Sequence, residues 1–266
     1  MSGISIVTAF FDIGRGDWTP QKGLPHYLHR TTDTYFERFG HLAQLDNEIV
    51  VFTSEDLADK VYELRKDKIT KTKIISIDFQ NTFQKERELI SKVQKNPNFQ
   101  SMISPMQIRN PEYWSADYVL VNYLKSHLVN FAITNNFVNT DIVAWLDFGY
   151  CRNKETLNNV KEWKYPFDTT KIHFFNFREY ENLPIQTIIA NNIVHMFGAK
   201  IVAGKEMWPK LEELIRGAFK NLTDANMIDD DQTLMLLAYL YDKELFELHR
   251  IDENDPFVIF RNFNEN

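Results

Sequence analysis

The chain has 266 residues, of which 44% are hydrophobic and 25% are charged, and this composition provides ample material for a folded core. Its formal net charge of -7 argues against a nucleic-acid partner, because neutralising a phosphate backbone requires a basic face. Cys151 is the single cysteine, so the sequence excludes an internal disulfide and indicates a reducing compartment.

The first eighty residues predict three strands that alternate with two helices. Residues 4–10, 48–53 and 73–79 are short apolar runs of the kind found in buried strands. Apolar residues at helical spacing predict one helix after Thr31 and a second after Ser54, which is placed to cap it. This β-α-β-α-β order is typical of a parallel sheet with helices on its faces. Such an order is compatible with a nucleotide-binding half-domain.

The elements predicted beyond residue 80 continue this alternation. Residues 80–105 predict a helix and a connection, and Pro111 opens a helical segment predicted over 112–133. The later elements are a strand over 142–146, a short strand over 172–177, a strand pair within 186–204, and helices over 208–222 and 233–241. No repeat or linker interrupts the chain, so no strong domain boundary is expected.

The most informative segment is DIVAWLDFGYCR, residues 141–152, in which an apolar strand stops at Asp147. A carboxylate at the carboxyl end of a buried strand lies where α/β sheets present ligands and metals. Mg²⁺ or Mn²⁺ binds through one or two carboxylates together with substrate phosphates, so Asp147 is a candidate metal or donor ligand. The alternative is an ordinary strand-end carboxylate that caps a turn. Asp-Phe-Gly is also a protein-kinase motif, but no HRD or VAIK sequence accompanies it.

The loop FDIGRGDW, residues 11–18, follows the first strand and places a glycine on each side of Arg15. One interpretation makes Arg15 a diphosphate contact, with glycines that let the backbone approach the ligand. The other is a glycine-rich turn with a solvated arginine. Neither GxGxxG nor GxxxxGK[ST] is present, so the sequence favours neither a dinucleotide site nor a P-loop.

Three carboxylates, Asp229, Asp230 and Asp231, immediately precede the predicted helix over 233–241. The helix dipole and the free amides of the first turn explain such a cluster structurally. Alternatively, Asp230 or Asp231 faces a cleft as a general base or acceptor ligand, and its neighbours cap the helix.

Lys125 and His249 are further candidate site residues, whereas Cys151 is not a candidate nucleophile. Lys125 is the one cation on an otherwise apolar and aromatic helix, where it reaches either solvent or a phosphate. His249 is a candidate late metal ligand or a surface or packing histidine, and the absence of HExxH gives a zinc hydrolase little support. Cys151 has no obvious base nearby in the sequence, so we do not expect a nucleophile there.

Five ordered segments resemble the HtrL/YibB family across nearly the whole chain: IVTAFFDIGRGDW, EIVVFTSEDL, SPMQIRNPEYWSADYVLVNYLKSHLV, VAWLDFGYCR and DDDQTLM. Members occur in lipopolysaccharide and capsule gene clusters and resemble GT-A type glycosyltransferases. The resemblance implies a GT-A-like (Rossmann-like) α/β fold, with a mostly parallel central sheet flanked by helices and a helical C-terminal part. It also implies a single domain over 1–266, with a nucleotide-binding half over about 1–150 and an acceptor-side half over about 151–266.

The same resemblance assigns roles to individual residues. It implies donor binding by Thr8, Ala9, Phe10 and Arg15, donor and metal binding by Asp147, and an acceptor-side catalytic acid at Asp230 or Asp231. The residues themselves add Lys125 as a candidate donor contact and His249 as a candidate metal ligand. The sequence departs from the DxD motif of GT-A enzymes, because Gly149 replaces the second aspartate. Dependence on Mn²⁺ or Mg²⁺ is therefore a hypothesis.

The expected activity is that of a hexosyltransferase-like glycosyltransferase, which moves a sugar from a nucleotide-sugar donor to a glycan or glycolipid acceptor in surface polysaccharide biosynthesis. The alternatives are a nucleotidyltransferase or other sugar-nucleotide processing enzyme, and a non-catalytic GT-A-like protein that binds sugar nucleotides. No run approaches the ~18 apolar residues of a membrane span, so we expect a cytoplasmic protein. Peripheral membrane association stays open, since a lipid-linked acceptor requires no spanning segment.

Overall fold

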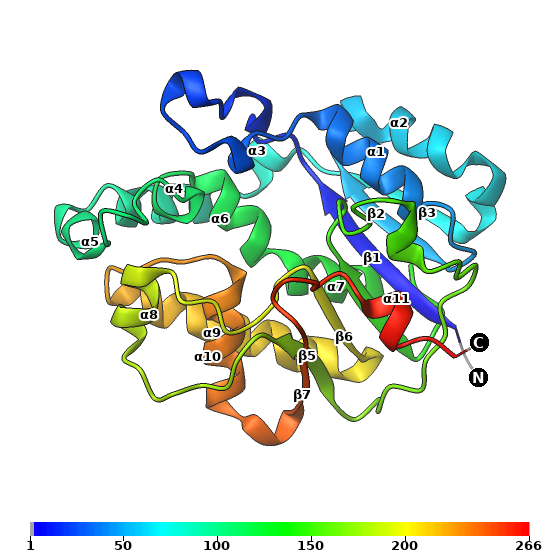
Figure 1. The fold of residues 1–266 in the computed structure, drawn as a ribbon. Helices are drawn as coiled ribbons and strands as arrows, with labels where there is room; N and C mark the ends of the chain where they lie inside the picture. The colour runs from blue at the N-terminus through cyan, green and yellow to red at the C-terminus, as the bar shows by residue number, and fades with distance from the viewer. Residues whose placement is uncertain (1–2, 266) are drawn as a thin grey trace.

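The computed structural model describes residues 3–265 and is built on a seven-stranded sheet in the order β3-β2-β1-β4-β6-β5-β7 (Figure 1). The strands are β1 Ile4–Phe10, β2 Ile49–Thr53, β3 Thr72–Ser76, β4 Ile142–Leu146, β5 Ile172–Asn176, β6 Lys200–Gly204 and β7 Phe246–Arg250. β6 pairs antiparallel with β4 and β5, whereas the other strand pairs are parallel. The predicted α/β fold with a mostly parallel sheet is therefore confirmed.

Helices cover both faces of the sheet, as Figure 1 shows. The α-helices are α1 Thr32–Leu42, α2 Glu55–Arg65, α3 Phe79–Thr82, α4 Gln84–Gln94, α5 Pro97–Met102, α6 Ala116–Tyr123, α7 Lys125–Thr134, α8 Ile185–Asn191, α9 Trp208–Asp224, α10 Asp231–Tyr241 and α11 Ile259–Asn262. Apolar side chains of α1, α2 and α11 form one core with one face of the sheet, and those of α6, α7, α9 and α10 form a second core with the other. No helix in the described residues is both long and apolar enough to cross a bilayer.

Both β1 and β4 are buried along their whole length, which explains their uninterrupted apolar sequences. From β1 the chain moves outward through β2 to β3, and then returns to place β4 on the other side of β1. In open α/β sheets, ligands bind beyond the carboxyl ends of the strands at such a reversal. Pairing of Val7 with Trp145 brings the ends of β1 and β4, and hence Phe10 and Asp147, to the same edge of the sheet.

The predicted strand pair within 186–204 is wrong. Residues 185–191 form helix α8, because Ile185, Ile188 and Ile189 recur at helical spacing and pack into the core. Only β6 remains as a strand in this region, and it lies between β4 and β5.

Other predicted boundaries also need correction. The helix predicted over 112–133 is divided into a 3₁₀ turn, Pro111–Tyr113, and helices α6 and α7. Ser115 caps the start of α6, and Leu124 separates α6 from α7. β3 ends at Ser76, and Asp78 then caps α3. Ser54 precedes α2 but makes no side-chain cap. β7, which lies at the edge of the sheet beside β5, was not predicted.

Candidate active site

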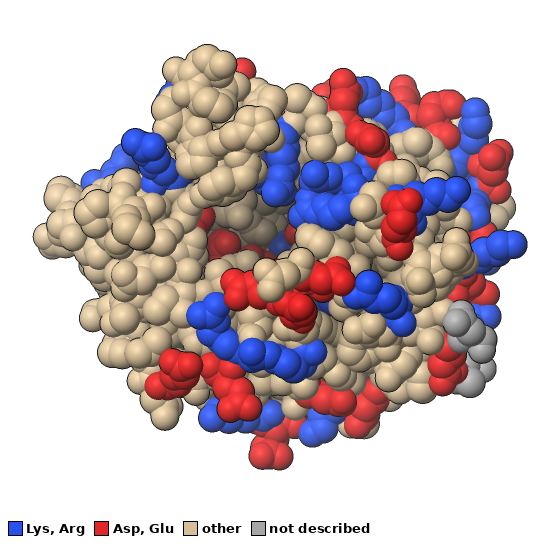
Figure 2. Space-filling model, viewed as in Figure 1, with Lys and Arg blue, Asp and Glu red and all other residues tan. Residues whose placement is uncertain are grey.

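A cavity of about 310 Å³ opens at the carboxyl ends of β1 and β4. Its lining residues come from three segments of the chain, 9–35, 118–152 and 197–232. Its charged lining residues are Asp12, Arg15, Arg30, Lys125, Asp147, Arg152, Asp230 and Asp231. Figure 2 shows a hollow near the middle of this face, where acidic and basic side chains gather. The volume lies at the lower end of the range for small-molecule sites.

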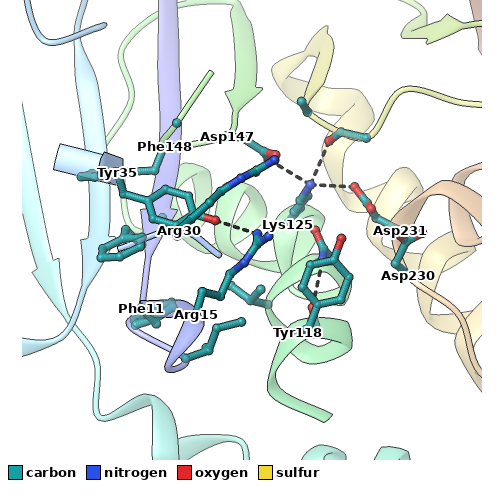
Figure 3. A pocket seen from close by; sticks show the side chains of 18 of the residues that line it. Phe11, Arg15, Arg30, Tyr35, Tyr118, Lys125, Asp147, Phe148, Asp230 and Asp231 are labelled. Carbon is teal, nitrogen blue, oxygen red and sulfur yellow. Dashed lines mark hydrogen bonds and ion pairs between the residues drawn. The ribbon is translucent and has the colours of Figure 1, made fainter. Parts of the chain in front are cut away.

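Lys125, the first residue of α7, lies at the centre of this pocket (Figure 3). Its ammonium nitrogen is 2.9 Å from Asp147 Oδ1 and 2.6 Å from Asp231 Oδ2, and it donates a hydrogen bond to the Gly198 carbonyl oxygen at 2.9 Å. Burial by itself would lower the pKa of Lys125, but the two carboxylates outweigh this effect and raise the pKa. Lys125 is therefore a fixed positive charge, and the predicted alternative of a side chain that reaches solvent is wrong.

The side chain of Asp147 is held at the sheet edge but remains accessible to the pocket. Its Oδ1 accepts a hydrogen bond from Trp145 Nε1 at 2.9 Å, and its backbone N–H donates to the carbonyl of Ala199 at 2.9 Å. The side chain is 39% exposed, in contrast to the buried side chain of Asp231. Asp147 therefore presents a carboxylate with a defined orientation to a ligand in the cavity.

A divalent ion at Asp147 would need substrate phosphates and water as its other ligands. Within residues 3–265, three His, Cys, Asp or Glu ligand atoms come within 4.8 Å of one another only at His173, Glu247 and His249, so Asp147 belongs to no such cluster. Mg²⁺ and Mn²⁺ accept a site with one or two carboxylates when substrate phosphates and water complete the shell. The donor set at Asp147 suits that mode, in which the ion arrives with a phosphorylated ligand.

Arg15 lies across the pocket from Asp147 and is held by neutral partners. Its Nη1 donates to Tyr35 Oη at 2.7 Å, and its Nη2 donates to the carbonyl of Leu28 at 3.1 Å. The guanidinium also lies 5.2 Å from the centroid of the Trp18 ring. Gly14 adopts a φ of 77°, so glycine suits the turn that precedes this arginine. Because its partners carry no formal charge, Arg15 keeps its positive charge available for an anion.

Arg30 and Arg152 also line the pocket, although the sequence analysis did not assign them a role. Burial lowers the pKa of Arg152 to about 10, and the nearby charges of Arg30 and Arg38 act in the same direction. The Nη1 atom of Arg38 is buried without a hydrogen-bond partner among the described residues. Like charges this close destabilise one another in the absence of a counter-ion, so the arrangement favours an anionic ligand. Arg152 follows the strand-end Asp147 closely in the sequence, and this position could have identified it as a pocket residue.

Three carboxylates, Asp229, Asp230 and Asp231, lie at the start of α10 and form what we call the acidic wall. Asp230 caps α10 by accepting a hydrogen bond from the Gln232 N–H at 3.0 Å, and Asp229 accepts from the Asp230 N–H at 3.0 Å. Asp230 and Asp231 line the pocket, whereas Asp229 does not. Burial is the largest cause that raises the pKa of all three carboxyl groups. Repulsion by Asp231 adds to it for Asp229 and Asp230, whereas for Asp231 the charge of Lys125 acts in the opposite direction.

Not every residue named from the sequence lies at this pocket. Ala9 and Phe10 line it, but Thr8 does not: its side chain is buried within β1, and its Oγ1 has no hydrogen-bond partner within residues 3–265. His249 lies on β7 beside His173, and neither residue lines the pocket. The structure therefore does not bring His249 together with Asp147.

Cys151 and Gly198 are two small residues that lie near the pocket. Cys151 is buried, and burial raises the pKa of its thiol, which agrees with the expectation that it is not a nucleophile. Gly198 lies beside the Asp231 carboxylate, and a Cβ at this position would overlap the carboxylate oxygens. Only glycine therefore leaves space for Asp231 to reach Lys125.

The fold and the pocket together define an α/β protein with a charge-lined pocket at the switch point of its sheet. Residues 2–264 match the model of a family described as bacterial protein of unknown function (HtrL_YibB), and the chain belongs to this family, as its sequence predicts. Protein HtrL of Escherichia coli (strain K12) is 39% identical over 269 residues, which cover 100% of this chain and 94% of that protein.

Two solved structures show a weaker overall similarity. One is the apo form of mouse xyloside xylosyltransferase 1, with a TM-score of 0.44, 14% identity and coverage of 92% of this chain and 84% of that chain. The other is the inositol-1-phosphate CTP transferase from T. maritima, with a TM-score of 0.43, 9% identity and coverage of 94% and 86%. Neither similarity is close enough to transfer an activity, which has to be argued from the pocket.

Proposed function

We propose that this protein is a glycosyltransferase of GT-A type, which transfers a sugar from a nucleotide-sugar donor to a glycan or glycolipid acceptor. We further propose a role in surface polysaccharide biosynthesis, in the cytoplasm and in peripheral contact with the membrane where the acceptor is lipid-linked. The observation that carries the proposal is the position of Lys125 between Asp147, at the end of β4, and Asp231, at the start of α10.

The charge distribution supports a diphosphate ligand. Arg15, Arg30 and Arg152 face the same cavity as Lys125. Within the described residues none of these three arginines forms an ion pair, whereas Lys125 pairs with Asp147 and Asp231. Arginine side chains match phosphate oxygens with paired hydrogen bonds. The pyrophosphate of a nucleotide sugar would supply a counter-charge to these three arginines. Asp147 is accessible from the same side and completes the donor site.

In the proposed reaction, the bond between the anomeric carbon and the diphosphate breaks while the acceptor oxygen forms a new bond to that carbon. Arg15, Arg30 and Arg152 offer positive charge where negative charge develops on the leaving diphosphate, and such preorganised charge lowers the barrier. Lys125 holds Asp147 in the donor site. A divalent ion, when bound by Asp147 and the phosphates, supplies further charge neutralisation.

The acidic wall supplies the acceptor side of the proposed site. Asp230 uses Oδ1 to cap α10, and within the described residues its Oδ2 makes no hydrogen bond. Burial raises the pKa of Asp230, and a carboxylate with a raised pKa binds a hydroxyl proton more strongly. Asp231 pairs with Lys125 and positions it. We therefore assign the base to Asp230 and a positioning role to Asp231.

The proposal is tested by incubating the full chain with a panel of nucleotide sugars and Mn²⁺, with water or a lipopolysaccharide preparation as the acceptor. Release of a nucleoside diphosphate supports glycosyl transfer. Release of pyrophosphate or nucleoside monophosphate instead identifies a nucleotidyltransferase or another sugar-nucleotide processing enzyme. A ligand that raises the melting temperature with no product in any assay identifies a non-catalytic binding protein.

Two variants with the same chemical change provide the control. Asp147→Asn removes the charge at the carboxyl end of β4, and we expect a loss of roughly a hundredfold in turnover. Asp141→Asn makes the same change at an exposed position before the opposite end of β4, so it should leave turnover unchanged. Equal turnover in both variants would contradict the assignment of Asp147.

A further inference from the structure

A second cluster of potential ligands lies on the neighbouring strands β5 and β7, which run side by side at the edge of the sheet (Figure 1). His173 pairs in register with Glu247, and His249 follows two residues later on β7, so all three side chains share one face of the sheet. Their ligand atoms lie within 4.8 Å of one another. Because none of the three residues lines the pocket, this cluster is separate from the proposed active site.

The distances within the cluster are short enough for the three residues to share one ion. His173 Nδ1 and His249 Nε2 are 3.0 Å apart, and the carboxylate oxygens of Glu247 lie 3.5 Å from the former and 3.8 Å from the latter. Ligands at about 2.0–2.2 Å from a metal centre are separated from each other by distances of this order.

The hydrogen bond on the far side of His173 orients its lone pair toward the cluster. His173 Nε2 lies 2.9 Å from the carbonyl oxygen of Asp168, and a carbonyl can only accept, so this nitrogen carries the proton. The Nδ1 atom is therefore unprotonated in the neutral ring and faces His249. Metal-binding histidines commonly have this second hydrogen bond to a backbone carbonyl, because it fixes the tautomer and the ring orientation.

Burial keeps both rings in the form that binds metals. It lowers the pKa of His173 and lowers that of His249 to about 4, so both are neutral near pH 7. The charge of the nearby Lys200 also lowers the pKa of His249. Glu247 is half exposed, so an ion and its water ligands can enter from that side.

The geometry points to a binding site for one divalent transition-metal ion, formed by His173 Nδ1, His249 Nε2 and the Glu247 carboxylate. Two imidazoles and one carboxylate favour Zn²⁺ over Mg²⁺, which prefers oxygen ligands, and the fourth position is left for water. Such an ion would join the edge strand β7 to β5. Without an ion, a hydrogen bond from His249 Nε2–H to His173 Nδ1 also satisfies the two rings, and the experiment separates these states.

The test uses metal-free full chain titrated with Co²⁺ and Zn²⁺ in the absence of nucleotide. We expect one Co²⁺ ion per chain, with the visible absorption of a nitrogen-ligated site, and displacement by Zn²⁺ together with a higher melting temperature. His249→Gln should weaken binding by more than about tenfold, and so should Glu247→Gln, whose half-exposed position leaves folding intact.

Matched controls separate this site from other histidines and from the pocket. His26→Gln changes an exposed histidine outside the cluster, and Asp147→Asn changes the proposed donor site, so both should bind Co²⁺ as the unaltered chain does. The absence of saturable binding, or equal binding by the Glu247→Gln variant, would overturn the site and leave the hydrogen-bonded histidine pair as the explanation. The proposed glycosyl transfer is independent of either result.

Discussion

Lys125 donates a 2.6 Å hydrogen bond to Asp231, and this buried ion pair joins the start of α7 to the start of α10. The two residues come from the two halves of the chain that the sequence assigned to donor and acceptor. Separating them would leave a buried carboxylate without its counter-charge, which costs more than a surface ion pair contributes. The pair therefore ties the geometry of the pocket to the stability of the fold.

Replacing Lys125 by methionine should destabilise the protein by about 3–5 kcal/mol, because Asp231 is left buried and unpaired. Urea unfolding measures the change. Lys220→Met is the control, since Lys220 pairs with Asp224 on the exposed face of α9 and should cost at most about 1 kcal/mol. Similar losses in the two variants would show that the Lys125 pair does not stabilise the pocket.

Two glycine-to-alanine substitutions should have opposite effects. Gly198→Ala places a Cβ against the Asp231 carboxylate and should cost about 1–3 kcal/mol, together with the loss of the Lys125 contact. Gly217 lies inside α9 with open space at the position of an added methyl group, so Gly217→Ala should stabilise the protein by roughly 0.5–1 kcal/mol. Thermal unfolding of both variants checks the signs, and a stable Gly198→Ala protein would contradict the crowding.

The sequence carried enough information for the sheet and for the position of its ligand edge. Short apolar runs predicted β1 and β4, and the strand-end rule located Asp147 at a pocket. It could not predict that Lys125 reaches Asp231, because this contact depends on how α7 and α10 pack. The partner of His249 was equally inaccessible, since it required the unpredicted strand β7 and its register with β5.

The prediction for Arg15 concerns affinity for the donor. Arg15→Gln should weaken the binding of nucleoside diphosphates by roughly tenfold to a hundredfold, because a charge-assisted hydrogen bond contributes about 1.5–3 kcal/mol. Isothermal calorimetry with UDP, GDP and ADP measures the change for whichever of them binds. Lys22→Gln alters an exposed cation in the same N-terminal region but outside the pocket, and should leave affinity unchanged. Equal affinity in both variants would remove Arg15 from the donor site.

Binding of Mn²⁺ at Asp147 should depend on the nucleotide. Among the described residues Asp147 belongs to no cluster of three protein ligands, so we expect weak binding of Mn²⁺ by itself and tighter binding once a diphosphate supplies oxygen ligands. By linkage, Mn²⁺ must increase the affinity for the diphosphate by the same factor. Calorimetric titrations in both orders measure that factor. A diphosphate affinity that is unchanged by Mn²⁺ would exclude a metal-assisted donor site.

The acidic wall makes stability depend on pH in a defined direction. Burial raises the pKa of Asp229 to about 7, whereas its ordinary value is 3.8, so between these values the folded chain binds a proton that the unfolded chain has lost. Stability due to this group is therefore complete below about pH 4 and declines as the pH rises toward 7, by at most about 1.4 kcal/mol per pH unit for one proton. Glu112 is also buried and acidic, and its pKa is raised to about 8, partly through the charge of Asp229.

Asp229→Asn should remove most of this decline. Asparagine keeps an oxygen that accepts the Asp230 N–H but does not ionise, so its advantage over the unaltered chain should increase from pH 4.5 to pH 7. Urea unfolding at several pH values measures the two curves, with Asp141→Asn as the control at an exposed position whose curve should follow the unaltered chain. Parallel curves for Asp229→Asn and the unaltered chain would mean that Asp229 is already ionised in the fold. In that case the acidic wall would hold more negative charge than its burial allows us to expect, and Asp230 would become a weaker candidate for the base.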